Sequence, residues 1–251
     1  MTTLAYTLTS YDLWVIAVAV FAAVSCAVPG CFLVLRRMSL LGDAISHAIL
    51  PGLAVAFIIS GSRDVWVMLA GALIAGVLTT VLTDALARFG RIAEDAAMGI
   101  VFTVMFAAGV LLITLAARHT DLDPGCVLYG MIEGTPLITT PLFGVEIPRA
   151  AIILGTVAAS TIARVVIFFR PLTIVSFDPA LAASLGVPVR TVHYGLMVVV
   201  AVVAVACFEA VGSILVVAML IAPAAAAHLL TDRLPRMIII SIGLAVVSAI
   251  A

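Results

Sequence analysis

Charged residues are scarce in this 251-residue chain. They make up 10% of it, whereas a typical soluble domain carries roughly 25%. Hydrophobic residues make up 65%, and the mean hydropathy is +1.36. The 12 basic and 13 acidic residues nearly cancel, so the chain lacks the basic excess typical of nucleic-acid-binding proteins. This composition excludes an ordinary soluble domain and indicates an all-α polytopic membrane protein.

Cysteine and N-terminal targeting signals are also sparse. The four cysteines form no CxxC pair, and we expect them to pack singly as small hydrophobic residues. A bridge between Cys126 and Cys207 is conceivable, because both could approach the outer surface. The first 12 residues lack a positive region and a small-residue cleavage site. The first apolar run is therefore predicted to be a true span rather than a cleaved signal peptide.

Long apolar runs are what the chain does contain, and a bilayer core needs about 20 such residues per helix. Seven complete candidate spans lie at roughly 13–35, 40–60, 65–87, 96–117, 150–169, 191–208 and 211–230. An eighth begins near Met237 and is cut off at Ala251. The one sizeable loop, about 118–149, follows the fourth span. The sequence predicts a transmembrane helical bundle in which 1–251 form a single membrane domain.

Every basic residue is an arginine, and the positions of the arginines predict the topology. Loops after the first, third, fifth and seventh spans hold Arg36, Arg37, Arg88, Arg91, Arg170, Arg190, Arg233 and Arg236. The opposite side holds Arg63, Arg118 and Arg149. Because cytoplasmic loops are enriched in arginine, we expect the N-terminus to lie outside.

The second span contains a carboxylate and an imidazole four residues apart, Asp43 and His47. At this spacing the two side chains share one helix face. Arg36 and Arg37 mark the membrane interface, and a helix rises about 1.5 Å per residue. Asp43 is then expected about 9 Å and His47 about 15 Å inside a core about 30 Å thick.

Ionisable side chains at this depth are costly and are functional by default. A purely structural hydrogen-bonded pair is the alternative, and the depth favours a substrate pathway. Oxygen and imidazole ligands together suit a first-row divalent cation such as Mn²⁺, Fe²⁺ or Zn²⁺, and suit Mg²⁺ or Ca²⁺ less well. Two ligands fit a transient site from which the ion must leave again. The Pro51-Gly52 pair that follows is typical of interrupted helices on transport pathways.

A second informative segment, FDPALAASLGVP at 177–188, lies in the loop between the fifth and sixth spans. Asp178 suits an N-cap, Pro179 suits the first helical position, and Gly186 closes the helix. The result is a helix of about two turns at the cytoplasmic face. It is either an interfacial connector or a lever that docks on a soluble partner.

Other polar residues leave alternatives open. Glu209 should reach the outer interface, where it lines an ion entrance or extends to water. An acidic outer loop, with Asp121, Asp123 and Glu133, can concentrate cations or simply be solvated. His193 and His228 fall near the cytoplasmic ends of their spans and are interpreted as packing residues.

The sequence RMSLLGDAISHAILPG at 37–52 closely resembles the signature of the ABC-3 family of bacterial metal-ion permeases. Three further stretches match this family: EDAAMGI at 94–100, the 177–188 segment, and FEAVGSILVVAMLIAPAAAA at 208–227. The resemblance covers nearly the whole chain. The amino-acid sequence around His47 resembles the manganese and iron branch of the family more than the zinc branch.

The resemblance implies a permease subunit of an ABC importer in the bacterial inner membrane. A cytoplasmic ATPase dimer would drive alternating access, an extracytoplasmic protein would deliver the metal, and the permease would catalyse no reaction. The permease would pair with a second copy, either identical or a paralogue, and would hold no permanent cofactor. Asp43 and His47 match the family's pathway ligands, with Glu209 as a possible entrance. The family's ATPase-coupling helix corresponds to Asp178, Pro179, Ala180, Leu181, Ala182, Ala183, Ser184, Leu185 and Gly186.

Two rival functions fit parts of the pattern. A secondary metal transporter coupled to ions or protons could use a mid-membrane Asp and His, but it has no need of a capped cytoplasmic helix. An intramembrane metalloprotease is disfavoured because the chain lacks an HExxH motif. Because family members usually complete an eighth span, we expect this chain to be a fragment or to have a last helix that is shortened or missing.

Overall fold

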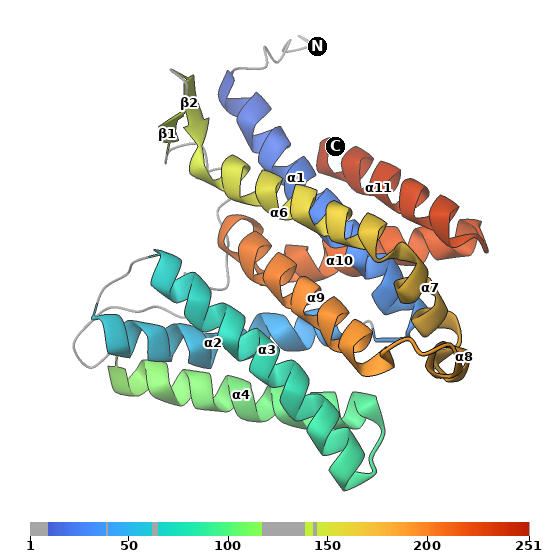
Figure 1. Ribbon diagram of the computed structural model, residues 1–251. Coiled ribbons are helices and arrows are strands. Elements are labelled where there is room, and N and C mark those ends of the chain that lie inside the picture. The colour runs from blue at the N-terminus through green and yellow to red at the C-terminus, as the bar shows by residue number, and fades with distance from the viewer. Residues whose placement is uncertain (1–9, 39, 62–64, 117–138, 143–144, 251) are drawn as a thin grey trace, which may run out of the picture.

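The structure is a computed structural model that describes residues 10–38, 40–61, 65–116, 139–142 and 145–250. Helices dominate these residues (Figure 1). The helices are α1 (Ser10–Leu35), α2 (Leu40–Ser60), α3 (Val65–Gly90), α4 (Glu94–Ala116), α6 (Arg149–Ile167), α7 (Phe169–Phe177), α8 (Pro179–Ser184), α9 (Val189–Val211), α10 (Ser213–Leu230) and α11 (Leu234–Ile250). A hairpin of β1 (Thr139–Leu142) and β2 (Val145–Pro148) precedes α6, with Thr139 opposite Pro148.

Each predicted apolar run forms a helix, but the predicted number of spans is not confirmed. Among the described residues, six helices are long and apolar enough to cross a membrane, and these belong to α1, α3, α4, α6, α9 and α10. Two shorter apolar segments are His47–Ser60 in α2 and Leu234–Ile250, the whole of α11. The chain is a multi-pass helical membrane protein, whereas seven complete spans plus an incomplete eighth remains a prediction.

The helices pack as two groups. In one group α2 packs on both α3 and α4, while in the other α1 packs on α6, α10 and α11. Helix α9 lies between the groups, in contact with α3 on one side and with α1 and α6 on the other (Figure 1). The element that carries His47 therefore belongs to a different group from the long central helix α1.

Close packing in both groups depends on glycines with no room for a side chain. A Cβ atom on Gly30 of α1 would lie 1.9 Å from the carbonyl oxygen of Leu220 in α10. A Cβ on Gly52 of α2 would lie 2.2 Å from the carbonyl oxygen of Gly71 in α3. Small residues let the backbones of membrane helices approach each other closely. In lipid the hydrophobic effect does not drive helices together, so van der Waals contact at these positions stabilises their association.

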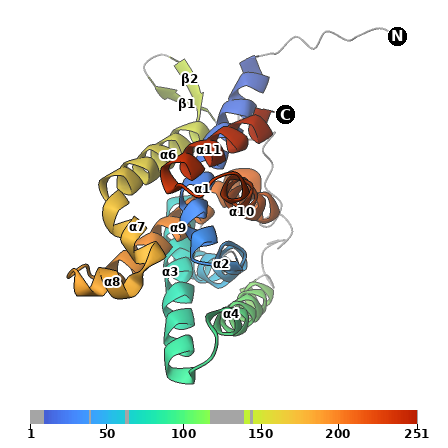
Figure 2. The same ribbon diagram turned by 90° about the vertical axis from the view of Figure 1, so that its right-hand side faces the viewer.

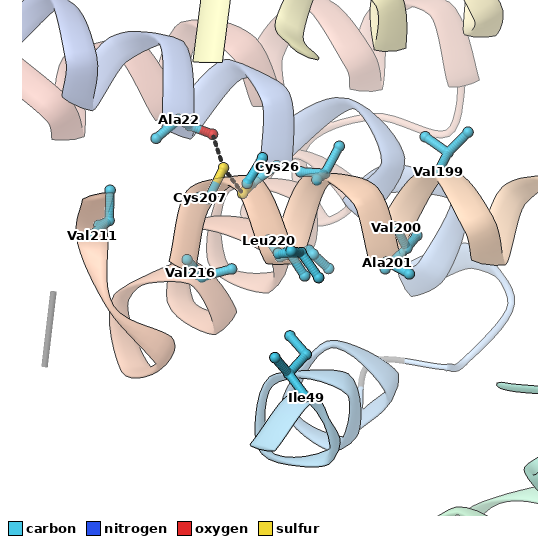
Figure 3. Packing of buried hydrophobic residues seen from close by; sticks show 14 of the residues in the cluster. Ala22, Cys26, Ile49, Val199, Val200, Ala201, Cys207, Val211, Val216 and Leu220 are labelled. Carbon is cyan, nitrogen blue, oxygen red and sulfur yellow. Dashed lines mark hydrogen bonds between the residues drawn. The ribbon is translucent and has the colours of Figure 1, made fainter. Parts of the chain in front are cut away.

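The core between α1, α9 and α10 buries two cysteines against each other. The Sγ atoms of Cys26 and Cys207 are 3.7 Å apart, and both side chains are fully buried (Figure 3). Cys207 is therefore a free thiol inside the bundle and not at the outer surface, so the conceivable bridge to Cys126 is wrong for Cys207. Cys126 lies outside the described residues.

The ends of α1, α7 and α10 and the start of α11 gather at one end of the bundle. A small hollow there is lined by Leu35 of α1, Phe177 of α7, His228 of α10 and Leu234 of α11. The start of α1, the hairpin and the end of α11 lie at the opposite end (Figures 1 and 2). Which of these two ends faces the cytoplasm stays a prediction from the arginines.

Two elements differ from the prediction. The hairpin β1–β2 occupies part of the segment 118–149 that was expected to be a loop. The fifth predicted span, 150–169, ends at Ile167, and a separate helix, α7, follows after Phe168. Apolar residues continue through α7, so hydrophobicity alone does not mark the break.

Candidate functional site

Helix α2 carries both predicted pathway residues. It begins at Leu40, so positions 43 and 47 lie one turn apart on a continuous helix, as the spacing predicted. The side chain of Asp43 lies outside the described part of the structure, and its contact with His47 stays a prediction. The side chain of His47 is described and is half-buried.

Two phenylalanines of α4 enclose the imidazole of His47. The ring of Phe102 has its centroid 5.3 Å from that of His47, at an interplanar angle of 55°. The ring of Phe106 lies 5.6 Å away in an edge-on arrangement at 89°. The Nδ1 atom of the imidazole is buried. The two phenylalanines are four residues apart and so share one face of α4.

The next turn of α2 is held tightly by its neighbours. A Cβ on Gly109 of α4 would lie 2.8 Å from the Cδ of Pro51, so the two helices are in backbone contact there. On the other side Gly52 meets Gly71 of α3. Pro51 has no N–H to donate to the carbonyl of His47 four residues earlier. The helical turn after His47 thus lacks one backbone hydrogen bond, and its packing against α3 and α4 holds it in place.

The site has a limited set of strong ligands. Within the described residues, no three His, Cys, Asp or Glu side chains gather closely enough to hold a metal ion. The imidazole of His47 offers one borderline ligand, and the aromatic rings beside it offer no lone pair. Such an arrangement can make a weak and reversible contact with a cation rather than enclose it.

Glu209 was predicted as a possible entrance residue. Its position lies in the last turn of α9, opposite the end that carries Arg190. Its side chain lies outside the described part of the structure, as do Asp121, Asp123 and Glu133. Their proposed roles remain predictions.

The predicted capped helix at 178–186 is confirmed as a local structure, α8. Asp178 is its N-cap, and the carboxylate accepts hydrogen bonds from the N–H groups of Ala180 at 3.0 Å and Leu181 at 2.9 Å. Pro179 occupies the first helical position. Gly186 has φ +77°, the left-handed conformation that glycine adopts without strain. The helix itself spans six residues, Pro179–Ser184.

The closing turn of α8 has both hydrogen bonds of a Schellman motif. The N–H of Gly186 donates to the carbonyl of Ala183 at 3.1 Å, and that of Val187 to the carbonyl of Ala182 at 3.0 Å. Ala182 is buried, whereas Leu181 and Leu185 are 50% and 61% exposed. The helix therefore anchors one face on the bundle and presents leucines on another.

A polar cluster at the arginine-rich end was not predicted. Arg36 donates from Nε to the Oγ of Ser176 at 3.0 Å, and its Nη1 lies 3.4 Å from the Nδ1 of His193. Tyr194 donates a short hydrogen bond to Asp84. His193 thus makes polar contacts and is more than a packing residue. We call Arg36, Ser176, His193, Tyr194 and Asp84 the interhelical cluster, because Arg36 directly follows α1 and the others belong to α7, α9 and α3.

Comparisons with known proteins agree with these features. The model of the ABC 3 transport family matches residues 9–251. The manganese transport system membrane protein MntD of Bacillus subtilis is 43% identical over 242 residues, which is 96% of this chain and 82% of MntD. The zinc transport system membrane protein TroD of Treponema pallidum is 40% identical over 209 residues, 83% of this chain and 57% of TroD.

A solved structure has the same architecture. PsaBC from Streptococcus pneumoniae, determined in complex with a Fab, contains a chain that superposes with a TM-score of 0.76 at 35% identity. The match covers 96% of this chain and 80% of that one.

Proposed function

This chain belongs to the ABC-3 transport family, and from that premise we propose that it is the permease subunit of an ATP-binding-cassette importer for divalent first-row metal ions. It is a multi-pass protein of the bacterial inner membrane. The observation that carries the proposal is the half-buried imidazole of His47 on α2, one turn from position 43, in a chain whose family match spans 9–251. On this proposal the chain binds and releases ions and leaves ATP hydrolysis to a partner.

The cargo is Mn²⁺ or Fe²⁺, with Zn²⁺ as the nearest competitor. Imidazole and carboxylate together are borderline ligands that suit these ions. Mg²⁺ prefers an octahedral shell of oxygen atoms and sheds its water reluctantly. The similarity to MntD, a protein named for manganese transport, supports Mn²⁺ among these ions.

The ion passes His47 and Asp43 without being trapped. Two protein ligands leave most of the coordination shell to water or to other groups, so binding is weak enough for release. Phe102 and Phe106 hold the imidazole in one orientation and add no ligands of their own. A pathway site requires ligands that are held in one orientation but bind the ion with low affinity.

Helix α8 is the contact with the ATPase dimer. Phe177, Leu181 and Leu185 are each at least half exposed, at the end of the bundle where the arginines predict the cytoplasm. Exposed apolar side chains on a capped, preformed helix are suited to a groove in a soluble partner. ATP binding and hydrolysis in that partner would drive alternating access through this helix.

The remaining partners lie in and outside the membrane. A second permease copy, identical or a paralogue, would complete the pathway that one chain lines on one side. An extracytoplasmic metal-binding protein would deliver the ion at the end where Glu209 lies.

Uptake by the reconstituted complex tests this proposal. Permease and ATPase in proteoliposomes should accumulate Mn²⁺ only with ATP, and competition among Mn²⁺, Fe²⁺ and Zn²⁺ should rank the cargo. Asp43→Ala and His47→Ala should each abolish accumulation, because each removes one of two pathway ligands, while the ATPase still co-purifies.

His228→Ala is the matched control for His47→Ala, because this histidine is exposed at the end of α10. The control should transport normally. Normal uptake in both pathway variants would overturn the site, and uptake that needs no ATPase would favour a secondary transporter instead.

A further inference from the structure

We propose that Arg36 is a positioning residue that passes movement of α8 to α2, through its hydrogen bonds to Ser176 and His193. The inference deepens the proposed function and rests on it. It concerns Arg36, Ser176 and His193, which lie outside both the motif at 37–52 and the capped helix. Three steps of contact carry it.

The first step joins α8 to α7. Ser176 lies two residues before Asp178, the N-cap of α8, and the N–H of Asp178 donates to the carbonyl of Ile174 at 2.8 Å. The two helices therefore share a hydrogen-bonded junction and pack against each other. A force that displaces α8 displaces Ser176 with it, because no flexible linker separates them.

The second step joins α7 to the turn that enters α2. The hydroxyl of Ser176 donates to the carbonyl of Leu172 at 2.6 Å, and so presents its lone pairs to the Nε of Arg36 at 3.0 Å. Arg36 follows the last residue of α1, and α2 begins at Leu40. Position 43 is therefore only seven residues beyond the guanidinium that Ser176 holds.

The two residues that follow Arg36 are bonded back to the end of α1. The N–H of Arg37 donates to Val34 at 3.0 Å and that of Met38 to Leu33 at 2.9 Å. Met38 is buried. Met38, two positions before the first residue of α2, is therefore held to the same helix end as Arg36.

The third step joins this turn to α9 and α3. Arginine has only donors, so its contact with the Nδ1 of His193 at 3.4 Å requires the imidazole tautomer that carries its proton on Nε2. The His193 ring packs edge-on against Tyr194 at 5.7 Å, and the hydroxyl of Tyr194 donates to Asp84. Asp84 also accepts from the Nε of Arg88 at 2.7 Å. The cluster thus connects α1 and α9 to α3, which packs on α2.

The adjacent arginine provides a matched control. Arg37 has the same charge and the same place in the arginine-rich turn, but its side chain is exposed, whereas that of Arg36 is half-buried. A role in topology or surface charge predicts equal effects at the two positions. A positioning role predicts an effect at Arg36 alone.

The experiment measures metal uptake per ATP hydrolysed by the complete complex in proteoliposomes. Arg36→Gln should lower this ratio about tenfold, the factor expected when a charged hydrogen bond is lost, while ATP hydrolysis and co-purification of the ATPase persist. Arg37→Gln should match the wild type. Arg36→Lys should fall between them, because lysine keeps the charge but not the planar fork of donors.

Two smaller substitutions keep the test decisive if Arg36→Gln does not assemble. Ser176→Ala and Tyr194→Phe each remove one hydroxyl, and each should lower the ratio with assembly intact. In a complex that does assemble, Arg36→Gln with Ser176→Ala should be no worse than Arg36→Gln alone, since both act on one contact.

A wild-type ratio in Ser176→Ala, or equal losses in Arg36→Gln and Arg37→Gln, would overturn the inference. A wild-type complex that takes up no metal would instead contradict the proposed function, so the two failures are distinguishable.

Discussion

The imidazole of His47 owes its orientation to side chains that bind no metal. Phe102 and Phe106 approach it from two directions, at centroid distances of 5.3 and 5.6 Å. An aromatic pair of this geometry is worth about 1 kcal/mol beyond its buried area. The same phenylalanine pair also excludes polar ligands from this face of α4. On the proposed function, these two residues orient the imidazole and leave it without a further ligand on this face.

Truncation of either ring should therefore weaken the apparent affinity for the transported metal. Phe106→Ala frees the His47 side chain to change rotamer, and the concentration of Mn²⁺ for half-maximal uptake should rise roughly fivefold, which corresponds to about 1 kcal/mol. The maximal rate should change less. Initial rates of uptake over a range of Mn²⁺ concentrations provide the measurement.

Phe106→Leu, which keeps most of the volume but not the ring, should have a smaller effect. Phe89→Ala serves as the control, because Phe89 is 91% exposed at the end of α3. An unchanged half-maximal concentration in both Phe102→Ala and Phe106→Ala would show that the phenylalanine pair does not orient His47.

The elements of this protein follow from local sequence to an unusual degree. Apolar runs predicted each long helix to within a few residues. The length of an apolar run is a property of the local sequence and does not depend on which helices pack against it. The caps of α8 were predicted for the same reason, since Asp178, Pro179 and Gly186 act within their own segment. Phe102, Arg36 and the Cys26–Cys207 contact were missed because their roles exist only after distant helices pack.

The capped helix allows a prediction at the scale of the element. Asp178→Ala removes the two N-cap hydrogen bonds, which costs about 1 kcal/mol of local helix stability. We expect less ATPase to co-purify with this variant, because α8 must then be ordered by the partner. Asp178→Ser keeps a capping oxygen and should restore most of the binding.

The measurement is the amount of ATPase retained on the immobilised permease after washing. Asp232→Ala is the matched control, because Asp232 is also exposed and lies at the same end of the bundle. Full retention by Asp178→Ala would mean that docking does not depend on a preformed α8. Gly186→Ala tests the other end and should act in the same direction, since alanine disfavours φ +77°.

At the scale of the whole molecule, α1 is the axis around which one helix group assembles. It contacts α6, α9, α10 and α11, and its approach to α10 depends on Gly30. The other group, α2 to α4, holds His47 and meets the first mainly through α9 and α10. The helices within each group therefore share more contact with one another than the two groups share with each other.

A single added methyl group should test how much the contact between α1 and α10 contributes to stability. Gly30→Ala places a Cβ atom 1.9 Å from a backbone oxygen of Leu220, so α1 and α10 must move apart. We expect a drop of several degrees in the thermal unfolding midpoint of the detergent-solubilised protein and a lower yield. The cost arises from overpacking, typically about 1–3 kcal/mol.

Gly243→Ala is the control, because nothing lies within 4 Å of the Cβ atom it would add in α11. Alanine is a better helix former than glycine by about 1 kcal/mol, so this variant should be unchanged or slightly more stable. Equal midpoints for Gly30→Ala and the wild type would show that α1 and α10 can separate without loss.

The closed ends of α8 have a consequence for speed. Asp178 accepts hydrogen bonds from the N–H groups of Ala180 and Leu181, and the turn at Gly186 donates to the carbonyls of Ala182 and Ala183. The helix is therefore already formed in the structure of this chain alone. Association then requires no disorder-to-order transition, and ordering entropy does not subtract from affinity at each encounter. A stiff segment also moves as one piece when it is pushed. On the proposed function, the rate at which the ATPase docks is therefore not limited by the folding of α8.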